Sequence, residues 1–305
     1  MACLSQVEGD IGAAGVVLPA RRRVGATTYL LFVKPHIVVT FVLVGMAGSV
    51  MAGAGHVALA KLLAVAVSVA LLGAAAECWT NLIDRGIDAV MPRTSGRSLP
   101  TGAVTVRSAA VLGACLSVAG FAAASALGVL PTLFLALAMF DNVVVYSALT
   151  KRSTPWSVVL GSAVGPLTLY AGYAAVKIPI ASSALLAGLM VAAWVPAHIW
   201  AIGVRYRADY ASASVPMAPV VWGRAHLALV SLLSGLAMGA LATGAFLSLG
   251  GAAGDWLAAA VVALSVLAVL GSAVVPWRER LAGPLVKLLT AYLLFVLISL
   301  IGLAA

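Results

Sequence analysis

The chain of 305 residues is 63% hydrophobic and only 9% charged, and its mean hydropathy is +1.14. Soluble domains are typically about 45–50% apolar, so this composition excludes an ordinary water-soluble protein. The net charge of +9 does not indicate nucleic-acid binding, because a DNA- or RNA-binding patch needs a polar domain and the sequence has none. Three scattered cysteines have no metal-binding spacing. We therefore expect the lipid bilayer to be the main surroundings of this chain.

The N-terminal residues 1–25 carry acids before the arginines at 21–23, which is unlike a cleaved signal peptide, and we predict a cytoplasmic tail. A helix needs about 20 apolar residues to cross the hydrocarbon core, and such stretches recur along residues 26–305. This region is predicted to be a single all-α transmembrane domain of about nine helices. The predicted spans are 29–52, 57–83, 107–127, 129–149, 156–176, 180–204, 225–248, 254–275 and 284–304.

The positions of the lysines and arginines predict the orientation of these helices. All but two of the 18 basic residues lie on the side of the N-terminus and of the ends of the even-numbered helices. Only Lys61 and Lys177 fall on the other side. Because cytoplasmic loops carry the excess of positive charge, we predict that the N-terminus and the loops that end the even-numbered helices are cytoplasmic.

The first polar cluster lies at the end of the second predicted helix and in the loop that follows. Spacings of four, three and four residues place four of its polar side chains on one helical face, namely Glu77, Asn81, Asp84 and Asp88. Two carboxylates one turn apart repel each other unless a cation lies between them, and Mg²⁺ typically takes one or two carboxylates together with substrate phosphates. Arg93 and Arg97 follow, and guanidinium groups bind phosphate oxygens bidentately. A solvated interface is the less favoured interpretation, because acids within membrane helices are costly and usually functional.

The second cluster lies at the end of the sixth predicted helix, where His198, Arg205 and Asp209 share a helical face. A lone histidine here would more often be a helix-packing residue. Together with Asp209 and the neighbouring arginines it is a candidate second wall for phosphate or metal, in which Arg205 contacts the diphosphate and Asp209 binds the metal.

The third cluster, at the end of the fourth predicted helix, contains Tyr146, Lys151 and Arg152. Positive-inside anchoring alone explains its two cations. However, all three clusters end even-numbered helices, so we expect them to meet at one cavity that is open at the cytoplasmic face. Acids for Mg²⁺ and cations for phosphate at the mouth of a lipid-facing cavity fit a substrate with a diphosphate head and an isoprenoid tail.

At these residues the sequence resembles the UbiA superfamily of intramembrane prenyltransferases, and within it the branch of the protoheme IX farnesyltransferases, or heme O synthases. The segments that carry the resemblance are Lys34-Pro35 and residues 84–94, 146–155, 161–172 and 194–219. The resemblance implies a nine-helix fold, Mg²⁺ as the cofactor, farnesyl diphosphate as the donor, and heme B as the acceptor that becomes heme O.

The resemblance also implies roles for particular residues. Asp84 and Asp88 would bind the metal, Asp209 would belong to a second acidic site, and His198 would face the heme. The implied diphosphate contacts are Arg93, Arg97, Lys151 and Arg152.

Some positions depart from the family pattern and leave the acceptor open. The departures include Thr80, Gly86, Ser98, Thr168 and Ala208. Asp141, deep in the fourth predicted helix, is an unexpected acid that could shape the acceptor pocket or hold a cationic intermediate. The alternatives are an enzyme with an aromatic or other lipid-soluble acceptor, and a membrane terpene cyclase. A transporter is less favoured, because no internal repeat is found and the polar groups gather at one face.

Overall fold

A computed structural model describes residues 25–54 and 56–304, and this part of the chain is almost entirely helical. It contains nine helices that are long and apolar enough to cross a membrane, as the sequence predicts. They are α2 (Pro35–Gly53), α3 (Leu59–Val90), α4 (Val106–Ser125), α5 (Val129–Phe140) with the π-helix Asp141–Thr150, α6 (Ser157–Leu160) with α7 (Val164–Ala174), α8 (Ser182–Arg205), α11 (Arg224–Leu249), α12 (Gly251–Val274) and α13 (Ala282–Ala304).

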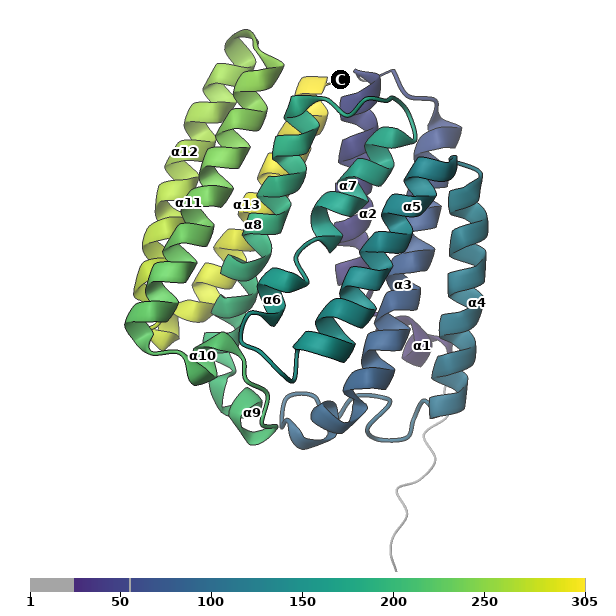
Figure 1. Cartoon of the computed structure of the whole chain (residues 1–305), viewed down its shortest axis with the longest axis vertical. Helices are drawn as coiled ribbons and strands as arrows, with labels where there is room; N and C mark the ends of the chain where they lie inside the picture. The colour runs from purple at the N-terminus through teal and green to yellow at the C-terminus, as the bar shows by residue number, and fades with distance from the viewer. Residues whose placement is uncertain (1–24, 55, 305) are drawn as a thin grey trace, which may run out of the picture.

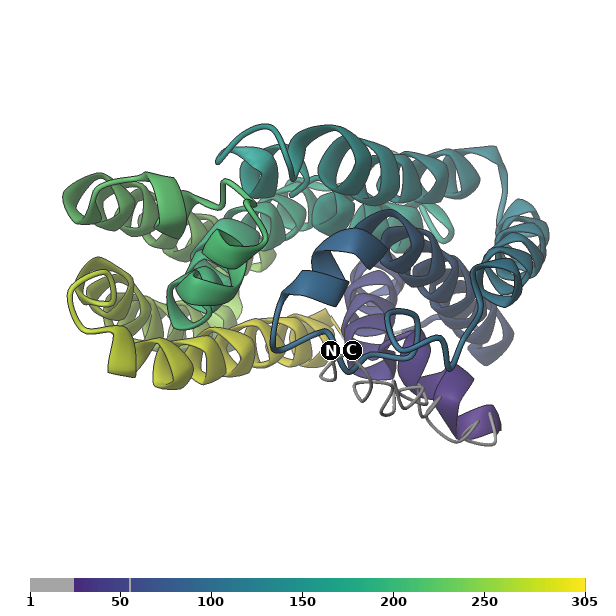
Figure 2. The same cartoon turned by 90° about the horizontal axis from the view of Figure 1, so that it is seen from below.

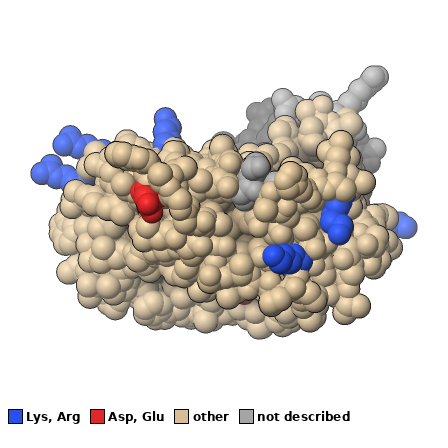
Figure 3. Space-filling model, turned by 90° about the horizontal axis from the view of Figure 1, so that it is seen from above, with Lys and Arg blue, Asp and Glu red and all other residues tan. Residues whose placement is uncertain are grey.

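Short elements lie at the lower end of the bundle in Figure 1. They are α1 (Ala26–Phe32), α9 (Arg207–Ser212), α10 (Ala218–Val221) and the 3-10 turn Glu279–Leu281. The loop of residues 91–105 lies at the same end, whereas the C-terminus is at the other. The ends of α3, of the π-helix and of α8 therefore reach one face of the molecule, as the sequence predicts. The opposite face is mostly uncharged (Figure 3).

Two groups of helices make up the bundle (Figures 1 and 2). In one group α3 packs against α4 and α2, while α7 packs against α2 and α5; in the other, α11 packs against α12 and α8. Contacts of α7 with α8 and of α13 with α8 and α2 join the groups. The buried core is almost wholly aliphatic and aromatic, with large side chains such as Tyr292 and Phe246 at its centre.

Helix α3 is longer than the sequence predicts, since it continues to Val90 where we expected an end near residue 83. The polar segment from Asp84 onward contains no proline and remains helical until Met91, whose backbone is extended (φ −71°, ψ 122°). Pro92 explains this end, because a proline disfavours the helical conformation of the residue before it. As a result, Asp84 and Asp88 both lie on regular helix.

Glycines allow α2 and α7 to approach each other closely. A Cβ atom on Gly172 would collide with the backbone carbonyl of Gly45, and one on Gly48 would collide with the backbone of Leu169. The Ser49 hydroxyl donates a hydrogen bond to the Gly172 carbonyl at 2.9 Å. Small residues at a helix crossing give this close packing in membranes.

We expect Gly172→Ala to destabilise the protein by about 1–3 kcal/mol, because the added methyl meets backbone that cannot move aside. Gly86→Ala is the matched control, since Gly86 lies on a helix with open space around its Cα. The measurement is thermal unfolding in detergent. Equal melting temperatures for the two variants would contradict the close approach of α2 and α7.

Candidate functional site

The carboxylates of Asp84 and Asp88 lie one turn apart near the end of α3, and both residues are buried, with exposures of 7% and 6%. The Lys151 ammonium donates to Asp84 Oδ2 at 2.5 Å. Arg152 Nη2 lies 4.0 Å from the other carboxylate oxygen of Asp84, and it donates to the backbone carbonyl of Ile83. The first and third clusters of the sequence therefore meet, because α3 and the π-helix end side by side.

Arg97 brings the loop of residues 91–105 back to α3. Its guanidinium donates to both oxygens of Asp88, at 3.1 and 2.9 Å. The hydroxyl of the buried Thr94 donates to the backbone carbonyl of Asp88 at 3.0 Å and fixes the turn between them. Both contacts come from one nitrogen, Nη1, so the other N–H groups of the guanidinium are left to bind a phosphate.

Arg93 connects this loop to the second cluster. Its backbone N–H donates to Asp209 Oδ2 at 3.3 Å, and its Nε lies 4.0 Å from the same oxygen. The Arg93 guanidinium also lies over the ring of Tyr206, 4.3 Å from the centroid, and 5.8 Å from that of Tyr210. A cation held over aromatic faces is attracted by their electron density. Arg93 thereby joins the loop to α9.

Glu77 and Asn81 share the helix of Asp84 but contact different partners. Glu77 Oε2 forms an ion pair with Lys34 Nζ at 2.6 Å, and Asn81 Nδ2 donates to the backbone carbonyl of Phe32 at 2.9 Å. Lys34 lies at the break between α1 and α2, with a positive φ of 49°. Lys34 is not among the site residues predicted from the sequence, although Lys34-Pro35 is one of the segments that resemble the family. In this structure these residues anchor the start of α2.

The π-helix positions Tyr146 and Lys151. Its hydrogen bonds run to the fifth residue back, as in the bond from the Lys151 amide to the Tyr146 carbonyl at 2.9 Å. Residues five apart therefore follow one another on the same face, and the Lys151 ammonium lies 5.5 Å from the centre of the Tyr146 ring. Burial alone would lower the pKa of Lys151, but Coulombic interactions with Tyr146 and Asp84 outweigh it and raise that pKa. Lys151 is therefore a cation throughout the physiological pH range.

Asp141 begins the π-helix and is buried, with 6% exposure. Its Oδ2 accepts a hydrogen bond at 3.0 Å from the backbone N–H of Val164, the first residue of α7. A carboxylate here satisfies an amide that the break between α6 and α7 would otherwise leave unpaired within the membrane. This contact gives Asp141 a structural function that the sequence analysis did not consider.

His198 lies on α8 and stacks on Trp194, with 4.4 Å between ring centroids and an interplanar angle of 19°. The Trp194 indole donates to the Leu289 carbonyl of α13 at 2.7 Å, which fixes the stack. The Nδ1 atom of His198 is buried and has no hydrogen-bond partner among the described residues. Arg205 is exposed and lies against Gly283 at the start of α13, and it forms no ion pair with a described carboxylate.

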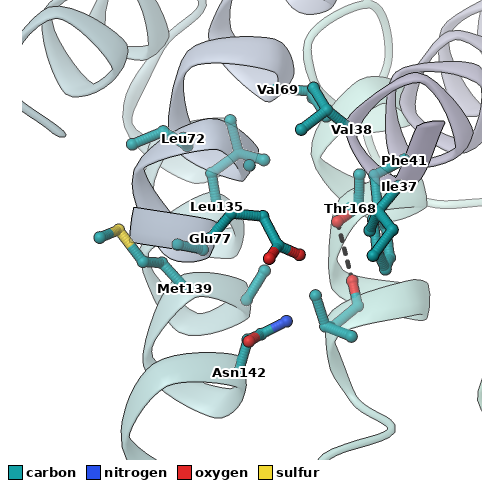
Figure 4. Close-up of a pocket in the computed structure, with 14 residues that line it drawn as sticks. Ile37, Val38, Phe41, Val69, Leu72, Glu77, Leu135, Met139, Asn142 and Thr168 are labelled. Carbon is teal, nitrogen blue, oxygen red and sulfur yellow. Dashed lines mark hydrogen bonds between the residues drawn. The ribbon is translucent and has the colours of Figure 1, made fainter. Parts of the chain in front are cut away.

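A small, partly open cavity lies between α2, α3, α5 and α7 (Figure 4). Its walls are mainly aliphatic and aromatic, and Glu77, Asn142 and Thr168 are its polar lining residues. The Glu77 carboxylate and the Asn142 amide point into the space between the helices (Figure 4). Glu77 and Asp84 are seven residues apart on α3, so they lie on one face about 10 Å apart along the helix axis. The cavity thus lies inward of the aspartates.

The oxygen atoms of Asp84 and Asp88 are the ligand type that Mg²⁺ prefers. Asp84 Oδ1 is buried and has no hydrogen-bond partner among the residues that the structure describes, so one carboxylate oxygen is available as a ligand. No group of three His, Cys, Asp or Glu side chains lies close enough to hold a metal within the part of the chain that the structure describes. Asp84, Asp88 and Asp209 therefore do not form a single preassembled cluster. The arrangement fits an ion that takes one or two carboxylates and completes its shell with phosphate and water.

Comparison with known proteins identifies the family. The model of the UbiA prenyltransferase family matches residues 38–298, which is most of the chain. The chain belongs to the UbiA prenyltransferase family. The prediction of an integral membrane protein of the prenyltransferase class is thereby confirmed.

Curated relatives come from bacteria and archaea and are named protoheme IX farnesyltransferases. That of Shewanella amazonensis is 38% identical over 64% of this chain and 66% of its own length, and that of Thermoplasma acidophilum is 37% identical over 63% and 68%. The relative from Pyrobaculum arsenaticum is 36% identical over 80% of this chain and 86% of its own. The matched segment thus spans about two thirds of the first two relatives.

Solved structures share the fold at low sequence identity. A digeranylgeranylglyceryl phosphate synthase has a TM-score of 0.74 at 16% identity, covering 91% of this chain and 98% of that one. A UbiA homologue from Archaeoglobus fulgidus, bound to DMAPP and Mg²⁺, has a TM-score of 0.69 at 17% identity, covering 90% and 99%. These likenesses confirm the predicted all-α membrane fold.

We expect Asp141→Leu to destabilise the protein by about 1–3 kcal/mol, because it leaves the Val164 amide unpaired. Asp141→Asn keeps an acceptor oxygen and should retain most of the stability. Thermal unfolding in detergent and the hydrogen-exchange rate of the Val164 amide measure the two effects. A leucine variant with wild-type stability and unchanged exchange would rule out this capping role.

Proposed function

We propose that this protein is an Mg²⁺-dependent enzyme that transfers the farnesyl group of farnesyl diphosphate to heme B, with addition of water, to give heme O and diphosphate. The observation that carries the proposal is the pair of buried carboxylates, Asp84 and Asp88, each held by a cation from another element. An apolar cavity lies farther along the same helix, where Glu77 is one of its lining residues. The names of the relatives, which are 36–38% identical over the matched segments, support heme B as the acceptor.

The charges of the site suit a diphosphate head. In the proposal Asp84, Asp88 and Asp209 are the metal ligands, and the diphosphate contacts are Arg93, Arg97, Lys151 and Arg152. Bound Mg²⁺ would neutralise phosphate charge, so that the allylic C–O bond breaks more readily. The cationic side chains stabilise the same developing charge on the leaving group, and fixed charges in a site with little water are especially effective at this.

The apolar cavity suits the farnesyl tail, because it continues inward along the face of α3 that carries Asp84. A diphosphate held at the aspartates would direct its hydrocarbon chain between α2, α3, α5 and α7. The aliphatic walls exclude water from the allylic carbocation until the acceptor reacts with it. His198 is proposed to face the acceptor, since its buried Nδ1 has no partner among the described side chains and backbone.

Each carboxylate of the site already has a cationic partner, so binding is an exchange of partners. On binding Mg²⁺, Asp84 would give up Lys151 and Asp88 would give up Arg97, and the released cations would be free to hold phosphate oxygens. Neither half of this exchange is favourable alone, because it would leave buried charges of one sign unpaired. The proposed orientation places this exchange at the cytoplasmic face, where the soluble diphosphate product is released.

The first test is to incubate the purified protein in detergent with Mg²⁺ and farnesyl diphosphate, with and without heme B, and to analyse the products by mass spectrometry. We expect a heme product that has gained a farnesyl group and water. Asp84→Asn and Asp88→Asn should each lower turnover by at least about 10²-fold. Asp255→Asn, at an exposed position on α12, is the matched control and should not change turnover.

Different outcomes separate the alternatives. Release of diphosphate with a cyclised hydrocarbon would replace the proposal by a terpene cyclase. If farnesyl diphosphate were consumed only in the presence of another lipid-soluble acceptor, that acceptor would take the place of heme B in the proposal. Full activity of the Asp84 and Asp88 variants would refute the metal-binding roles.

The exchange of partners predicts that Mg²⁺ and diphosphate strengthen each other's binding. In calorimetric titrations with inorganic diphosphate as the probe, we expect Mg²⁺ to tighten binding by about tenfold or more. In Asp84→Asn the effect of Mg²⁺ should be largely lost. An equal effect of Mg²⁺ on the wild type and on this variant would assign the coupling to complex formation in solution instead.

A further inference from the structure

A second group of basic side chains lies at the same end of the bundle, outside the candidate site. Its members are exposed arginines on α9, α11 and the segment before α13, namely Arg207, Arg224, Arg278 and Arg280. None of them lies within 4.0 Å of a carboxylate in the described residues. An unpaired guanidinium retains its full attraction for an anion, and it has the geometry to bind phosphate bidentately.

Two of these arginines line a small surface hollow between the end of α8, α10, the start of α11 and the segment before α13. Arg207 and Arg224 supply its positive charge, and Glu279 is its single lining carboxylate. Pro219 and Leu227 contribute apolar surface. The hollow therefore carries a net positive charge beside apolar walls, whereas Arg278 and Arg280 lie outside it.

Trp222 forms a rigid wall of this hollow. Its ring stacks on His226 with 4.6 Å between centroids, and it packs edge to face against Trp156 at 4.8 Å and Trp200 at 5.7 Å. Tryptophans gather at the level of the lipid headgroups in membrane proteins. The membrane-spanning helix α8 ends at Arg205, and α11 begins at Arg224. The hollow lies between these two ends and is therefore at the level of the lipid headgroups.

We infer that this hollow binds the phosphate headgroup of an anionic phospholipid in the adjacent leaflet, with phosphatidylglycerol as the simplest example. Arg207 and Arg224 hold the phosphate, and Trp222 packs against the glycerol region. The acyl chains lie along the outward face of α11, where Leu229, Leu233 and Leu236 are half exposed. The lipid is a structural ligand and not a substrate, so the inference does not depend on the proposed prenyl transfer.

Native mass spectrometry of the full-length protein in detergent, titrated with phosphatidylglycerol or phosphatidylcholine, tests the inference. We expect the wild type to prefer phosphatidylglycerol. The double variant Arg207→Gln/Arg224→Gln should bind it about thirtyfold more weakly. The matched control, Arg278→Gln/Arg280→Gln, removes the same charge outside the hollow and should retain the preference. Glu279→Gln should strengthen binding, because it removes the negative charge from the hollow.

Three results would overturn the inference. Equal binding of the two lipids by the wild type would exclude a headgroup-specific site. Equal losses in the two double variants would assign the preference to surface charge in general. Displacement of phosphatidylglycerol by inorganic phosphate at millimolar concentration would identify a site for soluble phosphate. Thermal unfolding of each variant in detergent, compared with the wild type, serves as the check that it is folded.

Discussion

Pairing of buried charge is the constraint on which the active end of this protein depends. Asp84 and Asp88 lie in surroundings where an uncompensated carboxylate is costly, and each has a cation from a different part of the chain. Lys151 fixes the end of the π-helix against α3, and Arg97 fixes the loop that follows α3. Arg93 extends the same network to α9 through Asp209. Three segments far apart in sequence thus converge because their charges require partners.

In the proposed function the same network would serve both the empty and the loaded enzyme. Ion pairs within the protein hold the acids and the cations close together before any ligand binds. They offset during folding the cost of bringing charges of like sign together. The apolar cavity inward of Asp84 adds a region in which hydrocarbon is stable and water is not.

Much of this arrangement could be predicted from the sequence, because hydrophobic runs, positive-inside charge and helical spacing report on the membrane fold directly. These patterns predicted the nine spans, the face on which the polar clusters gather, and the placement of Asp84 and Asp88 on one side of the same helix. Spacing cannot say which partner a side chain reaches, and so the pairing of Glu77 with Lys34 was missed. Spacing also could not predict that the Asp141 carboxylate accepts a hydrogen bond from the Val164 amide at the break before α7, because this contact joins separate helices.

The π-helix decides which way Lys151 points. In an α-helix, five residues turn through about 500°, so a side chain five positions on points about 140° away. The five-residue hydrogen bonding that ends at Lys151 instead keeps it near the face of Tyr146. α-Helical winding of the same number of residues would therefore turn Lys151 away from Tyr146 and from its ion pair with Asp84. The hydrogen-bonding pattern of this backbone segment thus matters to the site as much as the identity of its charged residues.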